Sequence, residues 1–281
     1  MKVTSEQFKG LLPSICDKET SSDPDNWTPE NPLWGHCAVA SLVAQNLFGG
    51  KLARASLEDT EFSGMGSHYW NILPDGTGKD FSVSQFQNKK LVLTVSERTR
   101  EYVLYDPKTG KPREIMKRYK LLAYRLAKSL SNNNPLFDDP IYRKCFYSAL
   151  DSPCQKMLFG CFLRYYHDYE RVGVAYWQEI ESCNKTIQPL KSICEPMCIR
   201  FNIQSRTESM IGACGHAEEL VLAKAAREKL PLGACEIYVA GLYSNGLPYI
   251  KTEPVFTCLR CAVQLYNFGV GKIYVPVVDK W

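Results

Sequence analysis

Two short motifs in the last third of the chain constrain its fold more than any other feature. His216 and Glu218 form a His-x-Glu, and a Cys-x-x-Cys made of Cys258 and Cys261 begins forty residues after Glu218. A Cys-x-x-Cys at the start of a helix lets both thiolates reach one metal ion, and a histidine opening the preceding helix supplies a third ligand. Three protein ligands leave one tetrahedral position for water, which is typical of a catalytic zinc site.

Glu218 lies two residues after the histidine, so it can face the open position without binding the metal. Zinc lowers the pKa of its bound water to about 7. A carboxylate beside that water can pass its proton to a ring nitrogen and to a leaving amine. This arrangement is typical of zinc nucleobase deaminases. We therefore expect His216, Cys258 and Cys261 to bind Zn²⁺ and Glu218 to act as the catalytic acid and base.

Residues 193–281 resemble the cytidine deaminase-like superfamily in these motifs, in their order and in the strand KIYVPVV that follows. The resemblance implies an α/β/α sandwich and hydrolysis of a C–N bond in a cyclic amidine, which turns a ring amine into a carbonyl and releases ammonia. Thr257 stands where the family usually has proline. Asn202 precedes His216 by fourteen residues, near the place where many members have an asparagine that holds the sugar or base.

Other interpretations of the cysteines stay open. Cys194 and Cys198 form a C-x₃-C that, with Cys258 and Cys261, would complete a structural site of four thiolates. The Cys-x-x-Cys alone is also typical of a redox pair. Both interpretations leave the His-x-Glu unexplained. A third possibility is a zinc-binding interaction protein without catalytic activity.

A second group of chemically reactive residues lies near the N-terminus. Cys37 opens a predicted helix that ends at Gly49, and a helix N-terminus stabilises a thiolate. His68 and Asp80 lie at the starts of two predicted strands. A nucleophilic thiol needs an imidazole base, which in turn needs a polar group to orient it. Asn71 is a second candidate for that orienting role, although it points to the other face of its strand.

Residues 27–128 resemble the YunG family, a bacterial group with papain-like architecture. The shared segments are GHCAVASLVAQNLFGG, SHYWNILPDG and KDFSVSQF, followed by the basic helix KRYKLLAYRL. The resemblance implies a papain-like α+β fold rather than a defined activity. His36 stands where we expect glutamine in that family, and either side chain can donate a hydrogen bond in an oxyanion hole. The alternative function is therefore a thiol amidase or peptidase centred on Cys37, while burial of Cys37 and His68 in the core stays open.

The chain is expected to be an α/β protein of two domains, residues 1–130 and 131–281, because Ser131–Pro135 favours a turn. Residues 140–183 are rich in aromatic side chains, and we predict that they form core helices extending the second domain. Other predicted helices cover 37–48, 114–130, 216–228 and 258–268. Predicted strands cover 67–73, 91–95, 102–105, 198–203, 235–242 and 272–278, with a further strand near Phe81.

The net charge of +4 is unevenly distributed. Residues 89–128 carry 12 basic and 4 acidic residues, whereas residues 129–281 carry 16 and 15. The second domain therefore has no polyanion signature, which favours a free base, nucleoside or nucleotide as substrate. The fusion to an unrelated domain favours DNA or RNA, by analogy with bacterial effector and defence proteins.

The sequence also bears on where the protein acts. We see neither an apolar signal-peptide core nor a run of 18 apolar residues, so we expect a cytoplasmic protein without a membrane partner. The 12 cysteines have irregular spacing, and we expect them to be reduced thiols or metal ligands.

Overall fold

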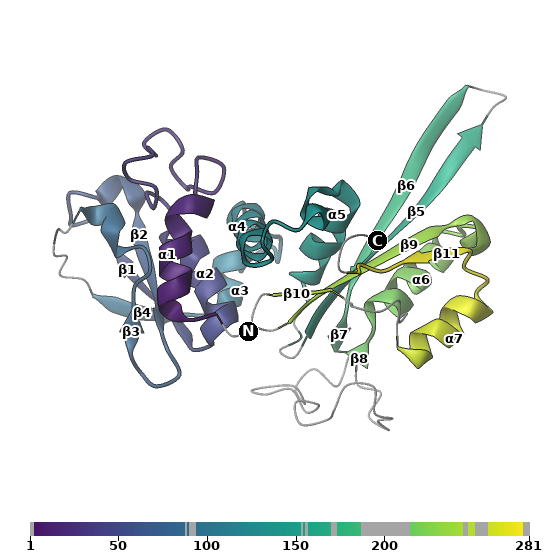
Figure 1. Cartoon of the computed structure of the whole chain (residues 1–281). Helices are drawn as coiled ribbons and strands as arrows, with labels where there is room; N and C mark the ends of the chain where they lie inside the picture. Colours follow the sequence, from purple (N-terminus) through teal and green to yellow (C-terminus); the bar gives the residue numbers. More distant parts are fainter. Residues whose placement is uncertain are drawn as a thin grey trace. The chain divides into compact units, whose positions relative to one another are not determined.

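The computed structural model describes residues 3–87, 89, 94–152, 154, 157–169, 173–186, 214–243, 247–250 and 258–277. The chain divides into two compact units, Met1–Ser129 and Leu130–Trp281. Figure 1 colours unit 1 from purple to teal and unit 2 from teal to yellow. Within the described ranges, no helix has the length and apolar character needed to cross a membrane.

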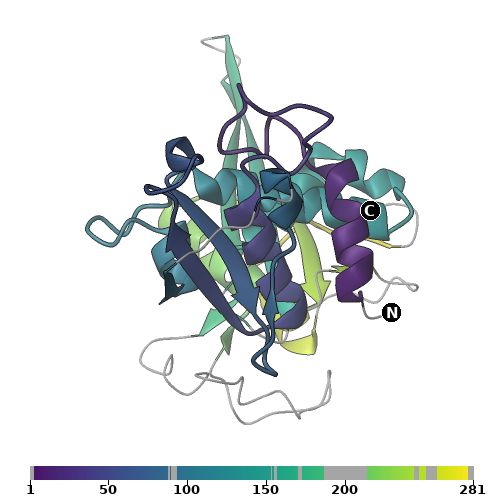
Figure 2. The same ribbon diagram turned by 90° about the vertical axis from the view of Figure 1, so that its left-hand side faces the viewer.

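Unit 1 pairs an antiparallel sheet with helices. Its helices are α1 (Ser5–Ile15), α2 (Cys37–Phe48), α3 (Arg100–Leu104) and α4 (Ile115–Leu130), and its strands are β1 (Lys51–Ser56), β2 (Ser67–Ile72), β3 (Gly78–Lys79) and β4 (Val95–Arg98). The strands lie in the order β3-β2-β1-β4. Helix α2 packs on β1 and β2, and α1 packs on α2. In Figure 2 the blue strands of this sheet face the reader, with purple α1 beside them.

Helix α2 is buried over most of its length because nearly all its side chains are apolar. Gly49 and Gly50 end it with φ values of 75° and 81°, a region that favours glycine. A Cβ atom at Gly50 would lie 2.1 Å from the carbonyl oxygen of Ile72. The glycine pair therefore lets the chain turn tightly from α2 into β1.

Unit 2 is built on a mixed sheet. Its helices are α5 (Pro140–Ala149), α6 (Ala217–Arg227) and α7 (Leu259–Asn267), and its strands are β5 (Met157–Tyr169), β6 (Val174–Cys183), β7 (Lys185–Thr186), β8 (Cys214–Gly215), β9 (Glu236–Tyr243), β10 (Pro248–Tyr249) and β11 (Lys272–Tyr274). The main sheet has the order β10-β9-β5-β6, and β11 pairs parallel with β9. Strands β7 and β8 form a separate pair.

Helices cover both faces of the main sheet in unit 2 (Figure 1). Cys161 and Leu163 of β5 pack with α6 in one buried apolar cluster. Gly160 precedes Cys161 on β5 and therefore points to the opposite face of the sheet, toward α5. A Cβ atom at Gly160 would lie 1.9 Å from the carbonyl oxygen of Cys145. The absent side chain at Gly160 therefore allows α5 to pack closely on the sheet. The result is a helix–sheet–helix arrangement, as expected for an α/β protein.

The prediction of core helices over 140–183 was wrong beyond Ala149. Strands β5 and β6 occupy most of this span as a long hairpin that runs past the rest of the sheet (Figure 1). β5 pairs with β9 only as far as Arg164. Further out the two strands pair only with each other in the described structure, as in the rung that joins Tyr166 to Trp177. We call this outer part of the hairpin, beyond Arg164, the β5–β6 arm. Tyr166 and Trp177 are both 44% exposed, so these aromatic residues of the arm are not core residues.

Other elements differ at a smaller scale. Residues 102–105 were predicted as a strand but lie mostly in α3, because Thr99 caps this helix by accepting a hydrogen bond from the Tyr102 amide at 3.2 Å. The predicted strand at 91–95 meets β4 only at Val95, and its residues 91–93 lie outside the described ranges, as does the predicted strand 198–203. Helices α2, α4, α6 and α7 and strand β9 lie where the sequence predicts them, within one or two residues.

Candidate functional site

Three predicted ligands converge in unit 2. The Nδ1 atom of His216 lies 3.1 Å from the Sγ atom of Cys258 and 3.2 Å from that of Cys261. All three potential ligand atoms lie within 4.8 Å of one another. His216 caps the N-terminus of α6, and Cys258 caps that of α7. The two helices therefore start at one point, as the spacing of the motifs predicts.

The two thiols are in different electrostatic states. Cys258 accepts a hydrogen bond from the Cys261 thiol and interacts with His216, which lowers its pKa to about 4. The same hydrogen bond and burial raise the pKa of Cys261. The pKa of His216 is raised, chiefly by its hydrogen bond with Cys258. The Cys258 thiolate can bind a metal cation directly, whereas Cys261 and His216 would release protons on binding it.

Glu218 lies in the first turn of α6 and is 6% exposed. Burial raises the pKa of its carboxyl group, and the neighbouring Cys258 and Glu219 raise it further. Because the charged form is costly in this environment, Glu218 is suited to hold and release a proton. The structure places this carboxyl group on the same helix turn as His216.

An ion pair that was not predicted from the sequence joins the two ligand-bearing helices. Arg260, which lies between the two cysteines, binds both carboxylate oxygens of Glu219 and donates to the carbonyl oxygen of Cys214 at 3.2 Å. Glu219 also accepts from the backbone amide of His216 at 3.0 Å. Because Glu219 follows the His-x-Glu and Arg260 lies within the Cys-x-x-Cys, the pair forms only when the two helix starts lie close together. The pair fixes α6 against α7 where the ligands meet.

The donor set fits a zinc ion chemically. Two sulfur atoms and one imidazole nitrogen are ligands that zinc prefers, and three ligands from two helix starts leave room for a fourth. Cys194 and Cys198, which the four-thiolate alternative requires, lie outside the described residues. Asn202, the predicted substrate-binding residue, also lies outside them.

The predicted residues of the N-terminal site also come together. Cys37 is the first residue of α2 and is 5% exposed. The Nε2 atom of His68 lies 2.6 Å from a carboxylate oxygen of Asp80. Asn71 instead donates to the carbonyl oxygen of Ser41 at 2.9 Å, so Asp80 is the residue that orients the imidazole. Asp80 follows the short strand β3.

His68 is held as an imidazolium between two partners. Burial alone would lower its pKa, but the hydrogen bond with Asp80 and the interaction with Cys37 outweigh this effect and raise the pKa to about 9. Asp80 occupies Nε2, whereas Nδ1 has no hydrogen-bond partner in the described part of the chain, and the Cys37 thiol donates to the carbonyl oxygen of Ser67 at 3.8 Å. Cys37, His68 and Asp80 therefore form a chain of interacting groups in the order that thiol catalysis requires.

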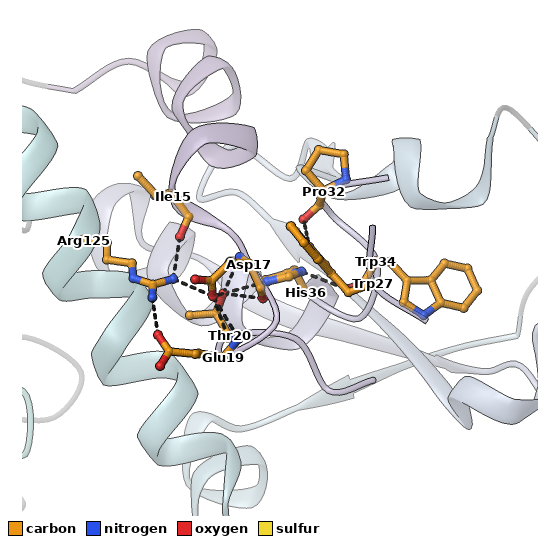
Figure 3. Close-up of polar contacts among 9 residues, drawn as sticks. All are labelled: Ile15, Asp17, Glu19, Thr20, Trp27, Pro32, Trp34, His36 and Arg125. Atoms are coloured by element: carbon orange, nitrogen blue, oxygen red, sulfur yellow. Dashed lines mark hydrogen bonds and ion pairs between the residues drawn. The ribbon is translucent and has the colours of Figure 1, made fainter. Parts of the chain in front are cut away.

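His36 does not serve as an oxyanion donor, contrary to the option raised by the sequence. Its Nδ1 lies 2.9 Å from the carbonyl oxygen of Trp34, and its Nε2 lies 2.8 Å from the hydroxyl of Thr20 (Figure 3). A carbonyl only accepts, so Nδ1 carries the proton and Nε2 accepts from Thr20. Burial lowers the pKa of His36 to about 4, which keeps it neutral. Both ring nitrogens are thus used to hold the loop before α2.

The raised pKa of His68 predicts a pH dependence of stability. A folded pKa of about 9, above the ordinary value of 6.5, adds stability that is complete below about pH 6.5 and lost as the pH rises through about 9. Asp80→Asn should remove much of this dependence, which amounts to about 3 kcal/mol in the wild type. Denaturant unfolding at about pH 6 and about pH 10 measures it. Equal pH dependence in the two proteins would contradict the assignment.

Comparison with known proteins identifies the first unit. Residues 4–131 match the model of the YunG protein family. The chain is 32% identical over 82 residues to "Uncharacterized protein YunG" of Bacillus subtilis (strain 168), an alignment that covers 29% of this chain and 63% of that relative. The chain thus spans less than two thirds of the relative that it matches. No solved structure matches the chain. The N-terminal unit is a YunG-like domain, and the family match ends before most of unit 2.

Proposed function

We propose that unit 2 is a zinc-dependent hydrolase that deaminates a nucleobase, in the manner of cytidine deaminase-like enzymes. The observation that carries this proposal is the convergence of His216, Cys258 and Cys261 within 4.8 Å, with the buried residue Glu218 in the first turn of the helix that His216 caps. A structural zinc site does not need a buried acid next to its ligands. The donor set and the acid together favour a catalytic centre.

The reaction replaces a ring amine by an oxygen atom from water. Zinc held by the three ligands supplies the Lewis acidity that activates the water. Glu218 accepts a proton as the water oxygen bonds to the ring carbon, and it delivers protons to the ring nitrogen and to the departing amine. The C–N bond breaks, ammonia leaves, and a carbonyl remains. Glu219 and Arg260 hold the two helices in register during these steps.

The substrate is a cytosine, adenine or guanine ring in a free base, nucleoside, nucleotide or nucleic acid. The first experiment measures zinc content and ammonia release with the purified full-length chain against each of these classes, including single-stranded DNA and RNA. About one zinc per chain and ammonia from one class would establish the function and name the substrate class. Zinc without ammonia from any substrate would instead indicate a zinc-binding interaction protein. A protein without zinc would contradict the proposal.

A second candidate function belongs to unit 1, because His68 is hydrogen-bonded to Asp80 through Nε2 and interacts with Cys37 on its other side. In a thiol amidase or peptidase, the Cys37 sulfur would bond to the carbonyl carbon of an amide while His68 gives its proton to the leaving amine. Water would then hydrolyse the thioester, which releases a carboxylic acid and restores the thiol. Activity that Cys37→Ala removes and that survives loss of Glu218 would assign turnover to unit 1.

A further inference from the structure

A buried series of hydrogen bonds, which we call the relay, runs from Asp80 through Ser82 and Gln85 to Gly35. Asp80 contacts the Nε2 atom of His68 through one carboxylate oxygen, Oδ2, at 2.6 Å. The other oxygen, Oδ1, accepts hydrogen bonds from the amide and the hydroxyl of Ser82, at 2.9 and 3.1 Å. Both carboxylate oxygens are thus held, and Ser82 sets the orientation of the carboxylate toward the imidazole.

Gln85 continues the relay toward the nucleophile. It lies in a short 3₁₀ helix, Val83–Phe86, that directly follows Ser82. Its side-chain nitrogen, Nε2, donates to the hydroxyl of Ser82 at 3.3 Å. Its side-chain oxygen, Oε1, accepts from the backbone amide of Gly35 at 3.3 Å. Because Gly35 precedes Cys37 by two residues, the relay reaches the loop that leads into α2.

The loop before Cys37 is fastened to Gln85 at two points. Besides the contact at Gly35, the side chain of Asn31 donates to the backbone carbonyl oxygen of Gln85 at 3.0 Å. Gly35 has a φ of 75°, a conformation that favours glycine, and a Cβ atom there would lie 2.4 Å from the hydroxyl oxygen of Ser21. The loop therefore has little freedom to move, and Gln85 helps to fix the start of α2.

The relay is shielded from water. Ser82 is 1% exposed and Gln85 is 0% exposed. Burial of a hydroxyl and an amide is costly unless they are hydrogen-bonded, and shielded hydrogen bonds are stronger than those in water. The next residue, Phe86, lies edge-on against the His68 ring, with centroids 4.8 Å apart. The same short helix therefore contacts the imidazole directly and the nucleophile loop through Gln85.

We propose that Ser82 and Gln85 are positioning residues of the thiol site. Through the relay, Ser82 aims the Asp80 carboxylate at His68, and Gln85 fixes the start of α2 relative to that pair. This inference rests on the thiol function proposed for unit 1, and it adds to Cys37, His68 and Asp80 two residues that act through them. Loss of either residue should loosen the arrangement of the three groups without removing any of them.

Nuclear magnetic resonance of the histidine rings measures the effect on the imidazole. The chain has only four histidines, so the His68 signal can be assigned by its absence from His68→Gln. Ser82→Ala should lower the pH midpoint of His68 protonation by about one unit, because the carboxylate is no longer aimed at the ring. Ser84→Ala makes the same change at an exposed serine and should leave the midpoint unchanged. Ser82→Thr keeps the hydroxyl and should restore most of the wild-type value.

A double-mutant cycle separates positioning from a general structural role. Cys37 of α2 and Asp80 after β3 are the titratable groups that interact with His68. If Ser82 acts by aiming the carboxylate, Ser82→Ala should shift the midpoint by less than about 0.3 unit in the Asp80→Asn background. An equal shift in both backgrounds would contradict the proposal, because the hydroxyl would then act independently of the carboxylate.

Alkylation of Cys37 tests the other end of the relay. Mass spectrometry of the Cys37 peptide from the full-length protein gives the rate of reaction with iodoacetamide near neutral pH, with glutathione as the reference thiol. The wild type should react faster than glutathione, and Ser82→Ala and Gln85→Leu should each react about threefold slower than the wild type or less readily still. Fast labelling that neither variant slows would overturn the positioning roles and leave the thiol function standing. A wild type no faster than glutathione would overturn the thiol function, and the positioning roles with it.

Discussion

Replacing Glu218 with glutamine is expected to stop ammonia release while the protein keeps its zinc. Glutamine has nearly the same shape but cannot accept or deliver a proton, and a positioned acid or base accelerates such reactions by about 10²–10⁴-fold. Glu218 is buried beside the ligands without being one of the three sulfur and nitrogen donors. The measurement is the initial rate of ammonia release together with the zinc content of the same sample.

The matched control for this variant is Glu228→Gln at the far end of α6, where the side chain is exposed and binds Gln178. It makes the same chemical change outside the site and should leave the rate unchanged. Full activity in Glu218→Gln would contradict the assigned proton transfer. Loss of zinc from Glu218→Gln would show that this carboxyl group supports metal binding instead.

Removing one ligand is expected to remove the metal and much of the stability of unit 2. His216→Ala leaves only the two thiols at the start of α7, and zinc content should fall from about one per chain to near zero. Because zinc binds the folded unit, its loss should lower the melting temperature of unit 2 by about 10 °C. Thermal unfolding with and without a chelator measures this change. The chelator should destabilise the wild type and leave His216→Ala unaffected.

His167→Ala is the control for ligand removal. His167 lies on the β5–β6 arm, where it bonds to Gln178 at 2.7 Å and lies outside the ligand cluster. This variant should keep zinc and its sensitivity to the chelator. Zinc binding that survives in His216→Ala would indicate a different ligand set, such as one that includes cysteines outside the described residues.

The sequence predicted the parts of the structure that local patterns determine. Motif spacing placed His216 and Cys258 at two helix starts, since each precedes an amphipathic segment. It did not predict the bidentate ion pair between Arg260 and Glu219, because a pair that joins two helices depends on how those helices are placed relative to each other. It likewise offered two partners for His68, and only the fold shows Asp80 in contact.

The error over the β5–β6 hairpin has a physical cause. A strand covered on both faces loses the alternation of polar and apolar residues by which strands are recognised. Phe162 and Leu163 are consecutive and both fully buried, because helices pack on both faces. The better signal was composition, since a run rich in tyrosine, phenylalanine and tryptophan is typical of strands. The suggestion that His36 is an oxyanion donor was wrong for a different reason. Both of its ring nitrogens form hydrogen bonds, with Thr20 and with the carbonyl oxygen of Trp34, and no local sequence pattern reveals these contacts.

The inner and outer parts of strand β5 are expected to differ in local stability, because only the inner part is paired with β9. Up to Arg164, β5 has neighbours on both sides and shares the cooperative unfolding of the sheet. Beyond it, β5 and β6 form an isolated ribbon, which is marginally stable in water. Stacked rings such as those of His167 and Tyr176, with centroids 4.7 Å apart, and the hydrogen bond from Gln178 to Glu228 then contribute to its support. The outer ribbon can therefore open without unfolding the sheet, so its opening leaves the cluster of His216, Cys258 and Cys261 in place.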